Sequence, residues 1–234
     1  MDRRLFNARS ASLLTLLTVS TWHQAYALSL ADLSNTDATK GLKEALEKGA
    51  LSAIGILGAE NGFLGNERVR INLPGALNDA ANLLRRFGQG GRVDELVTAM
   101  NRGAEAAVPQ AKRLLSSAVQ SMSVNDAKVI LTGGDTAVTD FFASKTRPAL
   151  AVTFLPVVTR ATEKVGLAGK YNEVAGKAAD MGLLKKEEAN IQQYVTGKTL
   201  DGLFLMIAEE EKKIRQNPVG YGSAILTKVF GALK

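Results

Sequence analysis

The chain has 234 residues, of which 46% are hydrophobic and 22% are charged, and its formal net charge is +6 at pH 7. This composition is typical of a folded globular protein and excludes a disordered chain. The sequence has no cysteine and a single histidine, which excludes a disulfide framework, a thiolate nucleophile and the usual zinc sites. Basic and acidic residues are interspersed, without the basic stripe of a nucleic-acid interface, so we expect no nucleic-acid partner.

Residues 1–27 have the pattern of a secretory signal peptide. Arginines near the N-terminus precede a short uncharged apolar run, and an Ala-Tyr-Ala triplet stands before Leu28. The run is too short for a membrane span, which needs about 20 apolar residues. Cleavage before Leu28 removes both Trp22 and His23, so the mature chain has no histidine for a Ser-His-Asp triad. We therefore expect a periplasmic protein, which is not lipidated because no cysteine follows the cleavage site.

Helical periodicity dominates the remaining chain, 28–234, which we interpret as a single all-α domain of about seven to nine helices. Apolar residues at spacings of three and four predict a first helix over 37–58. The stretch 67–73 alternates apolar and polar residues and predicts a short extended segment. Pro74 suits the first turn of the next helix. One face of that helix carries Leu77, Ala80, Leu84 and Phe87.

Two helices are predicted to be long. Over 92–122, two columns of apolar residues each repeat every seven positions, and one column is mostly alanine, which lets a neighbouring helix approach closely. Pro109 is expected to kink this helix. The second long helix is predicted over 190–217. Between them, Pro148 is expected to begin a helix and Pro156 to kink or split it.

The capping pattern of Ser123 and Asp126, three residues apart, predicts the start of a further helix. The TGKT stretch at 196–199 resembles the end of a phosphate-binding loop. That motif requires a glycine where the chain has Gln192, so we interpret Gly197 as a glycine within a helix.

A run of three glutamates, Glu209 to Glu211, precedes Lys213 and Arg215 near the end of the second long helix. Carboxylates can act as general acid and base or hold a hard cation. Acids placed four residues before bases instead favour ion pairs along a solvated helix face. We prefer the ion-pair interpretation, and we expect no catalytic residue, no metal site and no cofactor.

Five aromatic residues on kinked or glycine-broken helices are weak candidates for an apolar ligand pocket. They are Phe141, Phe142, Phe154, Tyr194 and Phe204. Such residues can surround a lipid or another hydrophobic small molecule. Apolar stripes on helices more often pack against other helices, so burial in the core is the alternative.

Four long stretches of this chain resemble, in order, the DUF4197 family of uncharacterised exported bacterial proteins. They are RINLPGALNDAANLLRRFGQG, LVTAMNRGAEAAVPQAK, DAKVILTGGDTAVTDFF and LDGLFLMIAEEEKKIRQNP. The resemblance covers essentially the whole mature chain. It implies an all-helical protein of a Gram-negative bacterium and transfers no catalytic residue.

Three functions remain open. The first is a non-catalytic binding or interaction protein of the cell envelope, with an unknown envelope protein as its partner. The second is a carrier of a lipid or another hydrophobic ligand. The third is a carboxylate-dependent hydrolase of cell wall or glycan, which needs two carboxylates about 5–9.5 Å apart. The missing histidine and cysteine argue against an enzyme, and the mild positive charge allows weak contact with a membrane surface.

Overall fold

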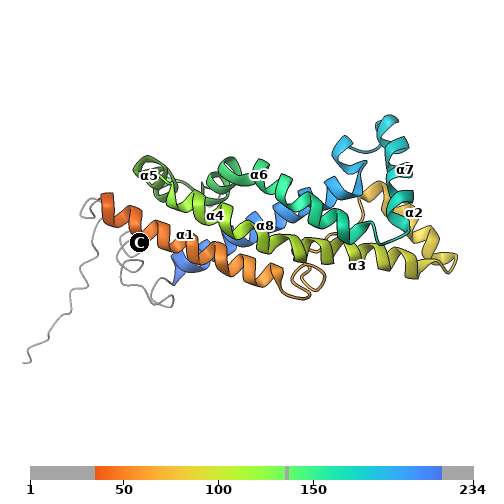
Figure 1. Cartoon of the computed structure of the whole chain (residues 1–234), viewed down its shortest axis with the longest axis horizontal. Coiled ribbons are helices and arrows are strands. Elements are labelled where there is room, and N and C mark those ends of the chain that lie inside the picture. The colour runs from red at the N-terminus through yellow and green to blue at the C-terminus, as the bar shows by residue number, and fades with distance from the viewer. Residues whose placement is uncertain (1–34, 135–136, 218–234) are drawn as a thin grey trace, which may run out of the picture.

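The computed structural model describes residues 35–134 and 137–217 (Figure 1). These residues form eight α-helices and two 3-10 helices, with no strand among them, so the predicted all-α class is confirmed. None of the described helices combines the length and hydropathy that a membrane span requires. The predicted signal peptide, 1–27, lies outside the described residues.

Three helices are longer than 20 residues. Two of them correspond to the helices predicted over 37–58 and 190–217, whereas the helix predicted over 92–122 is divided. In chain order the elements are α1 (Asn35–Gly58), α2 (Gly75–Arg86), α3 (Gly90–Ala107), η2 (Val108–Ala111), α4 (Lys112–Gln120), α5 (Val124–Thr132), α6 (Ala137–Thr162), α7 (Leu167–Asp180), η3 (Lys186–Glu188) and α8 (Ile191–Gln216).

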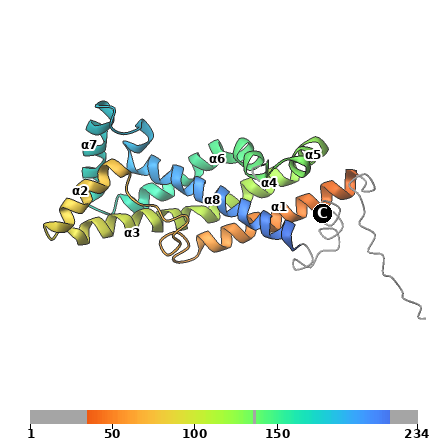
Figure 2. The same cartoon turned by 180° about the vertical axis from the view of Figure 1, so that it is seen from behind.

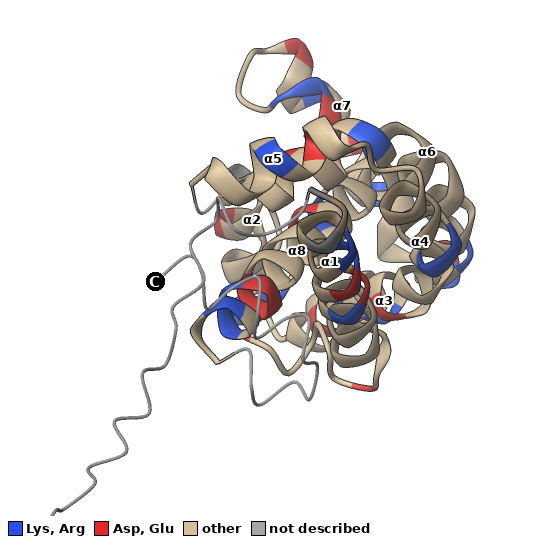
Figure 3. Ribbon diagram, turned by 90° about the vertical axis from the view of Figure 1, so that its left-hand side faces the viewer, with Lys and Arg blue, Asp and Glu red and all other residues tan. Residues whose placement is uncertain are grey.

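The helices form an elongated bundle (Figure 1). α6 packs along both α3 and α8, and α8 also packs along α1. α4 and α5 lie near one end with the start of α1, whereas α2, α7 and the start of α3 lie at the other end. Viewed along the long axis, basic and acidic residues are interspersed around the bundle (Figure 3).

The predicted helix over 92–122 is broken at the expected proline. α3 ends at Ala107, and Pro109 lies in the 3-10 helix that joins α3 to α4. Proline lacks the amide donor of a regular helix and crowds the preceding turn, which explains the break. Both predicted columns face inward, since every member is buried except Leu114, which is half-buried.

The prediction that Pro148 begins a helix is wrong, because α6 continues from Ala137 to Thr162 through both Pro148 and Pro156. Each proline deprives the carbonyl four residues earlier of its donor. Those carbonyls belong to Ser144 and Val152, which are both exposed, so water can satisfy them. The exposed position of both prolines therefore lets one long helix persist.

The segment between α1 and α2 keeps the predicted alternation without forming a strand. Residues 67–69 form a turn, and 70–74 have no regular secondary structure. Val69 and Ile71 are buried, whereas Arg68 and Arg70 are exposed. The capping box at the start of α5 is confirmed, because Ser123 and Asp126 exchange backbone and side-chain hydrogen bonds, each 3.0 Å long.

Candidate functional site

A groove of about 520 Å³ opens between α2, α3 and α7, at the end of the molecule where these helices gather (Figure 2). Its volume lies in the usual range for small-molecule sites. The apolar lining consists of Leu73, Leu77, Ala80, Ala81, Leu84, Val93, Leu96, Leu167 and Val174. The polar lining consists of Gln89, Arg92, Lys170 and Tyr171.

The α2 wall of the groove contains most of the apolar stripe predicted from the sequence. α2 packs mainly on α3, so its stripe has no helix fully covering it. Leu77 is buried, Ala80 and Leu84 are exposed within the groove, and Phe87 is exposed beyond it. The stripe therefore forms an open surface, although amphipathicity alone predicts a core face.

The α7 wall is fixed by Tyr171. Its ring is buried, and its hydroxyl donates a 2.8 Å hydrogen bond to the carbonyl of Glu188 in η3. Burial raises the pKa of the Tyr171 hydroxyl above its ordinary value, because the charged phenolate is poorly solvated there. The hydroxyl is therefore neutral near pH 7, and it ties α7 to the segment that leads into α8.

The groove is positively charged. Arg92 of α3 and Lys170 of α7 are its only charged lining residues, and both are exposed. Neither side chain forms a hydrogen bond or an ion pair with any residue in the described ranges. An apolar surface with two such cations suits a ligand that has an apolar body and an anionic group.

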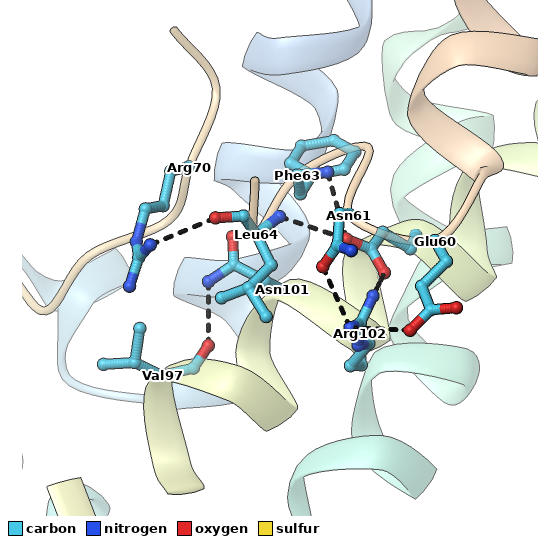
Figure 4. Close-up of polar contacts among 9 residues, drawn as sticks. Glu60, Asn61, Phe63, Leu64, Arg70, Val97, Asn101 and Arg102 are labelled. Atoms are coloured by element: carbon cyan, nitrogen blue, oxygen red, sulfur yellow. Dashed lines mark hydrogen bonds and ion pairs between the residues drawn. The ribbon is translucent and has the colours of Figure 1, made fainter. Parts of the chain in front are cut away.

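The loop that leads into α2 is anchored to α3 by buried polar side chains (Figure 4). Asn101 is fully buried, and its side chain accepts from the N–H of Ile71 at 2.8 Å and donates to the carbonyl of the same residue at 2.9 Å. It also donates to the carbonyl of Val97 at 2.8 Å. Every hydrogen-bonding group of this amide except one acceptor lone pair is thus satisfied.

Glu105, one turn further along α3, anchors the start of the same loop. Its carboxylate accepts from the N–H groups of Phe63 and Leu64 at 3.1 and 3.0 Å, and from Arg102 at 2.6 Å. Arg102 also donates to Asn61 at 3.0 Å and pairs with Glu60 at 3.3 Å. Because each of these polar groups has a hydrogen-bond or ion-pair partner, the cluster holds the loop against α3. The loop in turn positions α2, which follows it.

The five aromatic residues predicted as pocket candidates are all buried in the core. None of them lines the groove. The rings of Phe141 and Phe142 meet edge to face with centroids 5.5 Å apart, and the Arg147 guanidinium lies 5.7 Å from the centroid of Phe204. Their contact with a ligand stays a prediction, and the packing supplies the alternative explanation.

Tyr194 differs from the other four because it also lines a separate pocket of about 320 Å³. Its hydroxyl donates to the carbonyl of Asn72 at 2.8 Å, which links α8 to the loop before α2. Burial raises the pKa of Tyr194 to about 12. The cations Arg68, Arg70 and Lys198 line the same pocket, together with Asp201, which pairs with Lys198 at 3.9 Å.

The glutamate run in α8 is paired, although not entirely as predicted. Glu211 pairs with Arg215 as expected, but Glu209 pairs with Arg68 of the loop rather than with Lys213. Lys213 pairs with Glu210 at 2.5 Å instead. The face is not solvated either, because Glu210 and Glu211 are buried. No group of three potential metal ligands occurs among the described residues.

Comparison with known protein families identifies the family of this chain. Residues 32–231 match the family described as "Protein of unknown function (DUF4197)", which covers nearly the whole chain and confirms the resemblance noted in the sequence. No curated protein matches the chain, and no solved structure matches it.

Proposed function

We propose that this chain, which belongs to the DUF4197 family, is a non-catalytic binding protein of the cell envelope that carries a small anionic amphiphile. The ligand occupies the groove between α2, α3 and α7. The observation that supports this proposal is the groove itself, whose apolar walls are accompanied by two cations and no carboxylate.

The apolar walls supply most of the affinity. Each buried CH₂ group contributes about 0.8 kcal/mol, so an alkyl chain of about eight buried carbons contributes roughly 6 kcal/mol. Charge-assisted hydrogen bonds from Arg92 and Lys170 to a carboxylate or phosphate add to this. After the loss of translational and rotational freedom, we expect a dissociation constant in the micromolar range.

Export to the periplasm rests on the pattern of residues 1–27. Cleavage before Leu28 removes Trp22, the only tryptophan of the sequence. Protein purified from the envelope should therefore show tyrosine but no tryptophan emission, and its intact mass should be that of 28–234. Tryptophan emission from the envelope form contradicts the proposed cleavage.

A hydrolase is not supported by the carboxylates in the described part of the chain. The buried ones, Glu105, Glu210 and Glu211, are each held by an ion pair with Arg102, Lys213 or Arg215. A general acid needs a carboxyl group that is free to exchange its proton with the substrate. We therefore propose binding without bond cleavage.

Titration with a fluorescent fatty-acid analogue tests the groove. Ala80→Trp places a large ring in the groove, whereas Asn82→Trp adds the same ring to an exposed position of α2 that does not line it. We expect A80W to weaken binding at least about ten-fold by filling the space, and N82W to leave it unchanged. Equal affinities for A80W, N82W and the unchanged chain would exclude this groove as the site.

The charge preference has its own test. Arg92→Gln with Lys170→Gln should weaken binding of the fatty-acid analogue about ten-fold, while binding of the uncharged alcohol with the same chain stays constant. Arg113→Gln on α4, an exposed cation outside the groove, serves as the control. Equal loss for acid and alcohol means that the cations do not select an anionic group.

A further inference from the structure

We infer that the turn between α2 and α3 is a contact site for an anionic lipid surface, which goes beyond the groove and its ligand. The turn presents two large apolar side chains to solvent. Phe87 is 74% exposed and Leu83 is 55% exposed, and neither lines the groove. Leu83 and Phe87 are four positions apart, so they share one face of the helix end, and contiguous exposed apolar surface marks interaction sites.

The end of α2 holds Phe87 in this position. The N–H of Gln89 donates to the carbonyl of Leu84 at 2.8 Å, and the N–H of Gly88 donates to the carbonyl of Arg85 at 3.1 Å. With Gly88 at φ +74°, these bonds form a Schellman motif. The motif stops the helix directly after Phe87, so the ring stands at a capped and ordered helix end rather than in a flexible loop.

The charge around the turn favours an anionic partner. The segment 83–92 contains three arginines and no acidic residue. Asp94 of α3 pairs with Arg85 at 2.7 Å, which leaves Arg86 and Arg92 with no ion pair among the described residues. Cations beside exposed apolar side chains are the combination that binds anionic membrane surfaces.

The shape of the surface favours lipid over a protein partner. Phe87 and Leu83 lie on a projecting helical hairpin at one end of the molecule (Figure 1). Three of the five residues after Phe87 are glycine, so few large side chains surround the ring. A lipid interface accepts such a narrow projection, because Phe and Leu side chains enter the boundary between headgroups and acyl chains while neighbouring cations contact anionic headgroups.

Sedimentation with vesicles of phosphatidylglycerol and phosphatidylcholine tests this surface, with phosphatidylcholine alone as the uncharged comparison. We expect the chain to bind the anionic vesicles and to be released by salt. Leu83→Ser with Phe87→Ser should lower binding at least about ten-fold. Arg86→Glu reverses one charge near the lipid and should lower it about 30-fold.

Matched variants elsewhere on the surface provide the controls. Val129 on α5 and Val152 on α6 are 59% and 76% exposed, so V129S with V152S removes a similar apolar exposure away from the turn. Arg113→Glu on α4 reverses a charge that is also exposed. Equal effects of the control and turn variants, or no binding of the unchanged chain to anionic vesicles, overturn the proposal.

Two further outcomes separate this proposal from others. If the turn instead joins two copies of the chain, sedimentation velocity shows a concentration-dependent dimer that L83S with F87S abolishes, and the lipid proposal is wrong. If A80W loses the fatty-acid analogue but still binds vesicles, the turn acts independently of the groove. If A80W is folded but no longer binds vesicles, vesicle binding depends on the groove. That result overturns the proposal that the turn is the lipid contact site.

Discussion

The side chain of Asn101 forms both hydrogen bonds with Ile71 that a neighbouring β-strand would form. Its oxygen accepts the Ile71 N–H, and its nitrogen donates to the Ile71 carbonyl. The two residues are 30 positions apart in the sequence and both are buried. A single amide on α3 therefore substitutes for the sheet that the alternating sequence before α2 lacks.

Replacing Asn101 by alanine leaves the N–H and the carbonyl of Ile71 buried without a partner. We expect a fall of about 2–6 kcal/mol in the free energy of unfolding, because each of the two unsatisfied groups costs about 1–3 kcal/mol. Urea unfolding followed by circular dichroism measures this. Asn125→Ala on the exposed face of α5 is the control and should change stability by less than about 0.5 kcal/mol. Similar values for the two variants would mean that the Ile71 hydrogen bonds contribute little.

Gly62 lies where the loop after α1 passes against the end of that helix. A Cβ atom at this position would lie 2.4 Å from the carbonyl oxygen of Ile56, so Gly62→Ala requires the backbone to move. We expect G62A to unfold at clearly lower urea concentration than the unchanged chain, with a loss above about 3 kcal/mol.

Gly55, in the last turn of α1, should respond to alanine in the opposite direction. A Cβ atom there meets no atom within 4 Å among the described residues. Gly55→Ala should raise the free energy of unfolding by about 0.5–1 kcal/mol, because alanine restricts the unfolded chain and favours helix. Destabilisation by G55A, or tolerance of G62A, would contradict the packing around this loop.

The capping box of α5 predicts a dependence on acid. Hydrogen bonds from the backbone and side chain of Ser123 hold the pKa of Asp126 below its ordinary value of 3.8. A lowered pKa in the folded state adds stability above the ordinary value, and this stability is lost as pH falls through the folded pKa. The difference in unfolding free energy between the unchanged chain and D126N should thus be present at pH 7 and shrink below pH 3.8.

Urea unfolding over a pH series measures this difference. Asp79→Asn, at an exposed position of α2, is the control and should show little difference at any pH. At pH 7 we expect D126N to lose about 1 kcal/mol or less, the usual range for a helix cap. A difference that persists unchanged in acid would show that the Asp126 charge does not support the cap.

Alkaline pH should lower the stability of the fold through two buried tyrosines. Burial raises the pKa of Tyr171 and Tyr194, the latter to about 12, so the folded state binds these protons more tightly than the unfolded state does. Stability is therefore complete below the ordinary value of about 10 and falls as pH rises through the folded pKa. We expect their tyrosinate absorbance to appear only as helical circular dichroism is lost. Ionisation of all tyrosines near pH 10 with the helices intact would contradict their burial.

The sequence predicts those parts of the fold that depend on local spacing. Repeats of apolar residues locate α1, the α3–α4 pair and α8, and Ser123 with Asp126 locates the start of α5. Pro148 is the exception, because its effect depends on whether water can reach the carbonyl of Ser144. That accessibility is a property of tertiary packing and is not encoded in the spacing.

The candidate site is harder to predict from the sequence than the helices are. The stripe from Leu77 to Phe87 is visible as an amphipathic pattern, but the pattern is the same whether the stripe meets a helix or a groove. For the aromatic residues, such as Phe142 and Phe154, the sequence favours the core but leaves a pocket open. Asn101 gives no local signal, because its partner is a backbone group in a distant loop.

The last described helix, α8, runs back along the bundle beside the first described helix, α1. α8 starts beside α7 and runs for 26 residues, about 40 Å, toward the end of the bundle where α1 begins (Figure 1). The first half of α1 and the end of α8 therefore lie away from the groove and the turn of Phe87 (Figure 1). Attaching the protein to a sensor surface through residue 35 or residue 217 should leave the groove and the turn facing the solution, where vesicles and amphiphiles can reach them.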